Sequence, residues 1–147
     1  MKLSAKGRYG LAAMTYLAQN YEAGTPVTII SISEKLGISK IYLEQVFSLL
    51  KRARLVHSLK GAQGGYELAS PPQKITAYDI LSAIELALIE KTQTTADKVP
   101  ELDRALHTCV YDHLDAAIAN TLQKVTLTDI LTETERQKSS DNLMYFI

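Results

Sequence analysis

The segment from residue 39 to residue 54 carries side chains of the kinds that read DNA bases. Apolar residues recur at helical spacing over residues 40–54 and would form the inner face of a helix: Leu43, Val46, Phe47 and Leu50. Glu44 and Gln45 would then share the outer face with Ser48 and Arg52. A glutamate can accept a hydrogen bond from cytosine N4, and a glutamine can pair with adenine. The pattern therefore predicts a base-reading helix, and an ordinary solvent-exposed face is the alternative.

A glycine-rich segment follows this helix and lies between two short predicted strands, residues 55–59 and 66–68. Between them Lys60 and Gln63 are placed to reach a groove or phosphates, and Gly64 permits a close approach of the backbone. A phosphate-binding loop would instead follow a strand and open a helix. The strand-to-strand context favours the wing of a winged helix over a nucleotide-binding loop.

Three predicted helices position this surface. Ser4 would cap the first helix, which runs to about residue 21 before the stop signal at Gly24. Thr28 would cap a second, short helix that Gly37 ends, and Ser39 would cap the third. Two short helices joined by Gly-Ile-Ser form a helix-turn-helix pattern. The predicted fold class is mainly α with a small β-wing.

The charge distribution is suited to a polyanionic partner on one side of the molecule. The formal net charge is zero, but residues 1–66 hold nine Lys or Arg and three Asp or Glu, a net charge of +6. Residues 67–147 hold seven Lys or Arg and thirteen Asp or Glu, a net charge of −6. Lys6 and Arg8 belong to the basic half. Such a split is the electrostatic footprint expected of a nucleic-acid-binding protein.

The C-terminal half begins and ends with two similar segments, KITAYDIL at 74–81 and KVTLTDIL at 124–131. Each places a threonine three residues before an aspartate, so both are interpreted as helix starts with capping boxes. Between them Pro100 would open a long helix to about residue 123. Its broad apolar stripe comprises Leu102, Leu106, Cys109, Val110, His113, Ala117 and Ile118, widened by Leu114 and Leu122. Such a face predicts a dimerisation helix, unless it packs only on its own chain.

The lone cysteine, Cys109, lies on that apolar stripe, which predicts a buried structural thiol. The alternative is a thiol or redox sensor, which would need an exposed thiol in cationic surroundings. A single cysteine cannot form an intrachain disulfide, and no apolar run reaches the ~18 residues of a membrane span, so a cytoplasmic location is expected. Nucleophile–base pairs and zinc spacings are missing from the sequence, so the chain is not expected to be an enzyme.

Several of these segments resemble the IscR/CymR family of bacterial winged-helix transcription regulators. The resemblance is carried by KLSAKGRYGLAAM at the start, by YLEQ at 42–45 followed by the K-G-x-x-G-G-Y wing at 60–66, and by ITAYDIL. It implies a homodimer on pseudo-palindromic promoter DNA, with the recognition helix in the major groove and the wing in the adjacent minor groove. The implied DNA-binding residues are Lys6, Arg8, Ser39, Tyr42, Glu44, Gln45, Ser48, Arg52, Lys60, Gln63 and Gly64.

The chain departs from that family pattern in two places. Lys60 stands where many members have arginine, and a lysine is less suited to a narrow minor groove, so the wing should discriminate sequence more weakly. Iron–sulfur members carry three cysteines and a histidine in the loop and early long helix, whereas residues 85–108 here contain no cysteine. His107 and Cys109 are out of register. No cofactor is therefore expected, because a cluster takes four thiolates or a mixture with histidine.

Among members without a cluster, the chain most resembles the CymR-type regulators of cysteine metabolism, which act with cysteine synthase. This implies a repressor of cysteine and sulfur metabolism genes. The hypothesis for the C-terminal tail is that Met144, Tyr145, Phe146 and Ile147 dock into the synthase, and packing on its own dimer is the alternative. The expected organisation is a DNA-binding domain at 1–70, a helical dimerisation and regulatory region at 71–142, and an apolar tail at 143–147.

Overall fold

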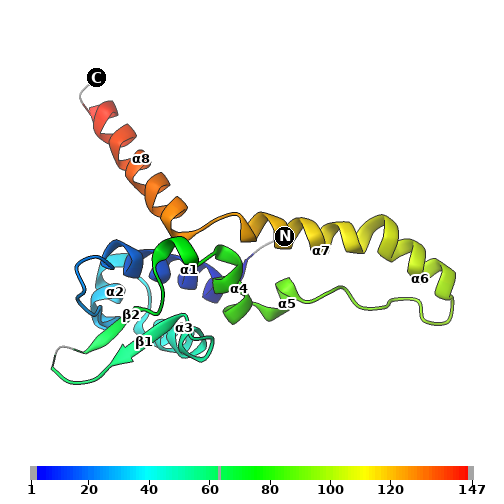
Figure 1. Ribbon diagram of the computed structural model, residues 1–147, viewed down its shortest axis with the longest axis horizontal. Coiled ribbons are helices and arrows are strands. Elements are labelled where there is room, and N and C mark those ends of the chain that lie inside the picture. Colours follow the sequence, from blue (N-terminus) through cyan, green and yellow to red (C-terminus); the bar gives the residue numbers. More distant parts are fainter. Residues whose placement is uncertain (1–2, 63, 146–147) are drawn as a thin grey trace.

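The computed structural model describes residues 3–62 and 64–145 and shows a mostly helical chain with one two-stranded antiparallel sheet (Figure 1). This confirms the predicted fold class. Gln63, Phe146 and Ile147 lie outside the described residues, as does the side chain of Tyr145. The elements are α1 (Ala5–Gln19), α2 (Ile29–Leu36), α3 (Lys40–Arg52), β1 (Val56–Leu59), β2 (Gly65–Leu68), η1 (Pro72–Lys74), α4 (Ala77–Ile84), α5 (Leu86–Ile89), α6 (Pro100–Leu106), η2 (His107–Tyr111), α7 (Asp112–Gln123) and α8 (Leu127–Tyr145).

Local signals set most of the helix ends. The Ser4 hydroxyl accepts a hydrogen bond from the N–H of Gly7 at 3.0 Å, and the Thr28 hydroxyl accepts one from the N–H of Ser31 at 3.1 Å. Gly37 ends α2 in the left-handed conformation, with φ of 69°. A side-chain oxygen at the N-cap satisfies a backbone donor that the helix itself leaves unpaired. The two predicted caps and the predicted glycine stop are confirmed.

Both ends of α3 differ from the prediction. Ser39 occupies the N-cap position, but its side chain makes no capping hydrogen bond, so the predicted cap is wrong. The helix ends at Arg52 rather than at residue 54, and Arg54 has a φ of +62°. The N–H of Leu55 bonds to the carbonyl of Leu50 at 3.0 Å and closes this end. An arginine takes the left-handed position that glycine usually fills, so no glycine marks the end of this helix.

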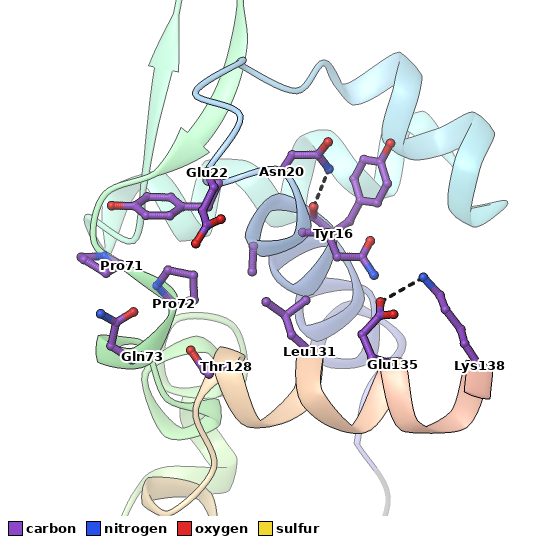
Figure 2. A pocket seen from close by; sticks show the side chains of 13 residues that line it. Tyr16, Asn20, Glu22, Pro71, Pro72, Gln73, Thr128, Leu131, Glu135 and Lys138 are labelled. Atoms are coloured by element: carbon purple, nitrogen blue, oxygen red, sulfur yellow. Dashed lines mark hydrogen bonds and ion pairs between the residues drawn. The ribbon is translucent and has the colours of Figure 1, made fainter. Parts of the chain in front are cut away.

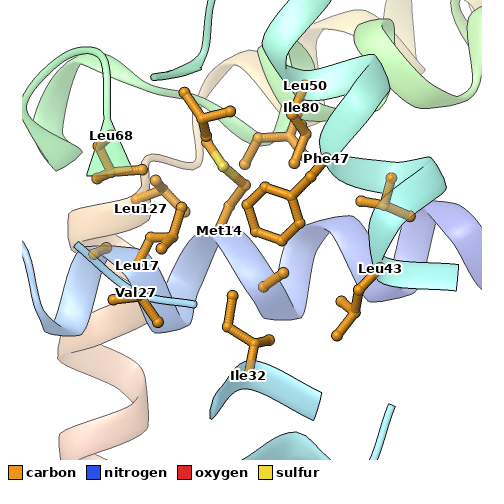
Figure 3. Packing of buried hydrophobic residues seen from close by; sticks show 14 of the residues in the cluster. Met14, Leu17, Val27, Ile32, Leu43, Phe47, Leu50, Leu68, Ile80 and Leu127 are labelled. Carbon is orange, nitrogen blue, oxygen red and sulfur yellow. The ribbon is translucent and has the colours of Figure 1, made fainter. Parts of the chain in front are cut away.

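One apolar core lies between the first helices, the wing and α4 (Figure 3). Met14 and Leu17 from α1 meet Phe47 from α3, and each is almost fully shielded from solvent. Leu43 from α3 and side chains from other elements close the cluster, among them Ile32, Leu68, Ile80 and Leu127. Ile80 and Leu127 lie beyond residue 70, so the core includes residues from both sides of the predicted domain boundary, which stays a prediction.

The two similar segments of the C-terminal half lie side by side. The N–H of Ala77 bonds to the carbonyl of Val125 at 2.8 Å, and the N–H of Leu127 bonds to the carbonyl of Ile75 at 2.9 Å. In each segment the threonine and the aspartate exchange hydrogen bonds at 2.9 and 3.1 Å, so both predicted capping boxes are confirmed. This pairing joins the start of α4 to the start of α8.

Two helical arms leave this joint in different directions (Figure 1). The first is the predicted long helix, which runs as α6, a π-helical turn η2 and α7, and all three elements lack a buried residue. Cys109 sits in the π turn and is exposed in the single chain, so the predicted burial of its thiol is wrong here. Along this arm Leu102, Val110 and Leu114 of the apolar stripe are exposed, whereas Leu106, Ile118 and Leu122 are half-buried.

The second arm is α8, which continues the chain as one helix to Tyr145. Its first turns pack on α1, whereas Leu143 and Met144 are 64% and 74% exposed. The described part of the tail therefore does not fold back onto its own subunit. Within residues 3–62 and 64–145, the helices are too short or too polar to cross a lipid bilayer.

Candidate nucleic-acid interface

Helix α3 has a buried face and an exposed face, and the two faces divide its residues as predicted. Leu43, Val46 and Phe47 are fully shielded from solvent and anchor the helix in the core. The opposite face exposes Ile41 to 68% and Tyr42 to 45%. Four predicted DNA-binding residues are exposed on α3 as well: Glu44, Gln45, Ser48 and Arg52. Because the apolar face fixes the rotation of the helix, its polar side chains project toward solvent.

The first turn of α1 borders the same surface. Lys6 lines a shallow hollow of about 450 Å³ together with α3 residues Ile41, Glu44, Gln45, Ser48 and Leu49. The rings of Tyr9 and Tyr42 meet edge to face at 5.7 Å between centroids and hold the two helices together here. The hollow therefore brings a cation from α1 next to two side chains that can hydrogen-bond to bases.

Two residues that were not among the predicted DNA-binding residues also contribute to this surface. Ile41 is the most exposed apolar residue of α3 and lines the hollow, where it could contact a thymine methyl group. Lys40 lies 4.0 Å from a carboxylate oxygen of Glu44, and more than half of each side chain is exposed. An exposed pair at this separation is weak, so Glu44 keeps its freedom to engage a base. The signal for the pair was the i,i+4 spacing of the two residues.

The wing is a short hairpin that is tied to the recognition helix. Strands β1 and β2 pair in antiparallel register, with Val56 opposite Leu68 and Leu59 opposite Gly65. The ring of Tyr66 in β2 lies 4.5 Å from that of Phe47 in α3. Two hydrogen bonds of 2.8 Å also link Tyr66 to Val27 before α2. The wing is thus anchored at its base on both sides.

The tip of the wing is built from glycines. Gly61 has a φ of +104°, and its carbonyl accepts a hydrogen bond from the N–H of Gly64 at 3.0 Å. A Cβ on Gly64 would lie 2.5 Å from the carbonyl oxygen of Leu59, so this position requires glycine. Lys60 is exposed at the end of β1.

The structure groups the predicted DNA-binding residues only in part. The hollow brings together Lys6, Glu44, Gln45 and Ser48. Arg8, Ser39, Arg52, Lys60 and Gly64 lie outside the hollow on α1, at the two ends of α3 and on the wing.

A larger hollow of about 880 Å³ lies elsewhere, between the end of α1, η1 and α8 (Figure 2). It is lined by Tyr16, Pro72 and Leu131, and an ion pair of 3.2 Å between Glu135 and Lys138 borders it. It shares no lining residue with the hollow on α1 and α3.

Two aspartates of the first arm hold the loop that precedes it. The carboxylate of Asp115 accepts hydrogen bonds from the N–H and the hydroxyl of Thr92 at 2.9 and 2.8 Å. That of Asp103 accepts from the N–H groups of Thr95 and Ala96 at 2.8 and 3.3 Å. The hydrogen bond from the Thr92 N–H is the main cause that lowers the pKa of Asp115. The hydrogen bond from the Thr95 N–H does the same for the pKa of Asp103.

Comparison with known proteins identifies the family. The model of the Rrf2 family, described as an iron-dependent transcriptional regulator, matches residues 3–133. The chain is 37% identical to the HTH-type transcriptional regulator CymR of Bacillus subtilis (strain 168) over 147 residues, 100% of both proteins. It is 35% identical to the regulator IscR of Aliivibrio salmonicida over 141 residues, 96% of this chain and 83% of IscR.

A solved structure gives the same answer. The structure of CymR, the global cysteine regulator of B. subtilis, matches with a TM-score of 0.76 and 34% identity, over 90% of this chain and 98% of that one. The chain therefore belongs to the Rrf2 family of transcriptional regulators, and the predicted resemblance to IscR and CymR is confirmed. Its relatives are regulators rather than enzymes, as predicted.

The family description mentions iron, but the donor set of this chain does not fit an iron–sulfur cluster. The chain has one cysteine, whereas cluster irons are held mainly by several thiolates. Within the described residues, His, Cys, Asp and Glu side chains form no group of three that could hold a metal ion. The loop before the first arm instead directs the N–H groups of Thr92 and Thr95 to aspartate carboxylates.

Proposed function

We propose that this member of the Rrf2 family is a homodimeric, sequence-specific DNA-binding regulator that places α3 in the major groove and the wing in the adjacent minor groove. The observation that carries the proposal is the hollow that joins Lys6 to Glu44 and Gln45. Cations position a protein on phosphates, and hydrogen-bonding side chains select bases. The hollow offers both on one exposed surface.

The first arm supports the homodimer. Leu102, Val110 and Leu114 are 48%, 43% and 57% exposed along α6, η2 and α7. An apolar stripe of this length is costly in water and is typical of a helix that pairs with a second copy. A two-fold pair would present two recognition helices to a pseudo-palindromic site.

Binding assays on duplex DNA test the first part. Affinity should fall steeply as the salt concentration rises. The logarithm of the binding constant should fall linearly with the logarithm of the salt concentration, with a slope of about −0.9 for each neutralised phosphate. Replacing Glu44 with alanine should change the preferred sequence, whereas replacing Lys6 or Arg8 should weaken binding to all sequences alike. A flat salt response would contradict the proposal.

The biological role that we propose is repression of cysteine and sulfur metabolism genes together with cysteine synthase, in the cytoplasm and without a cofactor. A structurally similar relative is a global cysteine regulator, and the exposed Leu143 and Met144 leave the tail available to a partner. The chain's terminal carboxylate would stand in for that of an amino-acid ligand. Pull-down with the cognate synthase should succeed with the full chain and fail after deletion of Ile147. Equal binding by both proteins would reject the tail hypothesis.

A second candidate is a thiol-sensing regulator that uses Cys109. The exposure of this cysteine favours it, because oxidants and labelling reagents reach only accessible thiols. The native dimer should then react with a thiol-specific reagent and lose DNA affinity, and a Cys109→Ser protein should keep its affinity under the same oxidant. A dimer whose thiol does not react would exclude this candidate.

A further inference from the structure

The first turn of α1 packs closely against the end of α4. Gly7 and Gly10 are buried on the side of α1 that faces Ile84 and Glu85. A Cβ on Gly7 would lie 2.9 Å from Cδ of Glu85, so a side chain at this position would push the carboxylate aside. Gly7 therefore leaves the space in which the carboxylate reaches the end of α1, and Gly10 leaves space for Ile84.

Glu85 uses this space to contact the N-terminus of α1. Its Oε1 accepts a hydrogen bond from the N–H of Ser4, the N-cap residue. Its Oε2 is buried and accepts no hydrogen bond from residues 3–62 or 64–145. The Ser4 hydroxyl meanwhile accepts from Gly7, so Glu85 and Ser4 serve different backbone donors of the same helix end.

The position of this carboxylate is favourable for a physical reason. The first N–H groups of a helix lack partners within the helix, and the helix dipole adds positive potential there. A negative side chain at this end is stabilised by both effects. Lys6 and Arg8 lie in the first turns of α1 and both are exposed, and Lys6 lines the hollow on α3. Whatever fixes the first turn of α1 therefore also fixes the backbone that carries these two cations.

Glu85 itself stands at a junction. It is the residue between α4 and α5, with φ of −118° and ψ of 66°, and its N–H bonds to the carbonyl of Leu81 at 2.6 Å. Beyond it, α5 and the loop that Asp103 and Asp115 hold lead into the first arm. The Glu85 side chain therefore joins the segment that follows α4 to the first turn of α1.

We propose that Glu85 is a positioning residue for DNA binding, whose carboxylate holds the first turn of α1 and so places Lys6 and Arg8 against the DNA. This inference rests on the proposed DNA-binding function.

Whether loss of the Glu85 carboxylate tightens or weakens DNA binding distinguishes a positioning role from a general effect of charge. Removing a negative charge from a DNA-binding protein should tighten its attraction to phosphates. Removing a carboxylate that positions two cations should weaken binding instead. Glu90 provides a matched control, because it is exposed five residues further on and makes no side-chain hydrogen bond within the described residues.

The experiment measures DNA affinity of the full-length chain by fluorescence anisotropy over a range of salt concentrations. The probe is a duplex that the wild-type protein selects from a random-sequence library. Glu85→Ala should bind on the order of tenfold more weakly, with a salt slope about 1 to 2 units shallower because up to two phosphate contacts are lost. Glu90→Ala should bind as tightly as wild type or more tightly.

Two further proteins distinguish positioning from general destabilisation. Glu85→Gln keeps the shape and an acceptor oxygen, so it should fold and recover most of the slope, with affinity weakened roughly two- to fivefold by loss of the charge at the helix end. In a Lys6→Ala, Arg8→Ala background, Glu85→Ala should have no further effect on affinity. A merely structural role would lower thermal stability and leave the salt slope unchanged.

The outcomes are separable. A wild-type chain that selects no duplex, or binds with a flat salt response, contradicts the proposed function. If the wild type binds and Glu85→Ala matches Glu90→Ala, the inference about Glu85 alone is overturned. Should Glu85→Ala fail to fold, Glu85→Gln decides, because binding equal to or tighter than wild type would reject a positioning role.

Discussion

The body of the molecule and its two arms bury apolar surface in different ways. In the body, α1, α2, α3, the wing and α4 enclose a core that includes fully shielded Met14 and Phe47. The first arm has no buried residue along α6, η2 and α7, and Leu114 is 57% exposed. The body thus buries its apolar side chains within one chain, together with Leu127 at the start of α8, whereas the outer parts of both arms leave apolar side chains exposed.

The largest effect should come from the centre of the body. Phe47→Ala removes a fully shielded ring that contacts Tyr66 in the wing and supports the recognition helix. We expect it to lower the free energy of unfolding by about 3–5 kcal/mol, because a large side chain is lost and a cavity remains. Urea denaturation followed by circular dichroism measures this. A loss below ~1 kcal/mol would mean that the body is not the stable unit.

The second prediction concerns the arms. Leu114→Asp would place a charge within the apolar stripe, and we expect the dissociation constant of the proposed dimer to rise on the order of 100-fold. Analytical ultracentrifugation of Leu114→Asp measures it. The matched control is Leu143→Asp on α8, which carries the same change on the other arm and should remain dimeric. If Leu143→Asp dissociates the dimer and Leu114→Asp does not, the arms have exchanged roles.

The same contrast explains what could be predicted from the sequence. The body follows local signals: Ser4 and Thr28 cap helices, Gly37 stops one, and the apolar period sets the two faces of α3. The end of α3 escaped prediction because Arg54 takes a left-handed conformation without glycine. Helix caps and glycine stops depend on a few neighbouring residues, so they can be predicted from the sequence. A helix end formed by an arginine in the left-handed conformation carries no such signal.

Features that depend on distant segments were beyond the sequence. The two capping-box segments are alike in sequence, but only the folded chain shows that they pair, with the N–H of Leu127 bonded to the carbonyl of Ile75. The contact of Glu85 with Ser4 joins residues 81 positions apart. The π turn that includes Cys109 shifts the helical register, and a constant period of 3.6 residues could not place that thiol.

A third prediction probes the anchoring of the wing to the body. Gly65 has a φ of +145°, and an added Cβ would lie 2.7 Å from the carbonyl oxygen of Val27. Gly65→Ala should cost about 1–3 kcal/mol of unfolding free energy, because backbone strain and a contact with rigid main chain combine. Gly24→Ala is the control, since Gly24 also has positive φ but open space around it, and should cost about 1–2 kcal/mol at most. If Gly65→Ala and Gly24→Ala lose the same unfolding free energy in thermal or urea unfolding, the chain has moved to relieve the contact of the added Cβ with Val27.

The smallest effect should be a local one in the loop that leads into the first arm. Asp115 has a pKa below its ordinary value, chiefly because it accepts the backbone hydrogen bond from Thr92. A carboxyl whose pKa is lower in the folded state than in the unfolded state, about 3.9, stabilises the fold above that pH. This contribution is lost as the pH falls through the folded pKa. The amide resonance of Thr92 should therefore shift at a midpoint below the usual range for an aspartate.

Asp115→Asn should abolish that titration of the Thr92 amide while leaving the Thr95 amide, which bonds to Asp103, to titrate as before. Asp97→Asn is the matched control, because Asp97 is exposed in the same loop and makes no hydrogen bond within the described residues. Amide NMR spectra recorded across the acidic range follow all three proteins. If Thr92 titrates equally in all three, the loop is not held by Asp115. Separate titrations at Thr92 and Thr95 would instead show that two independent carboxylates hold the loop to the arm.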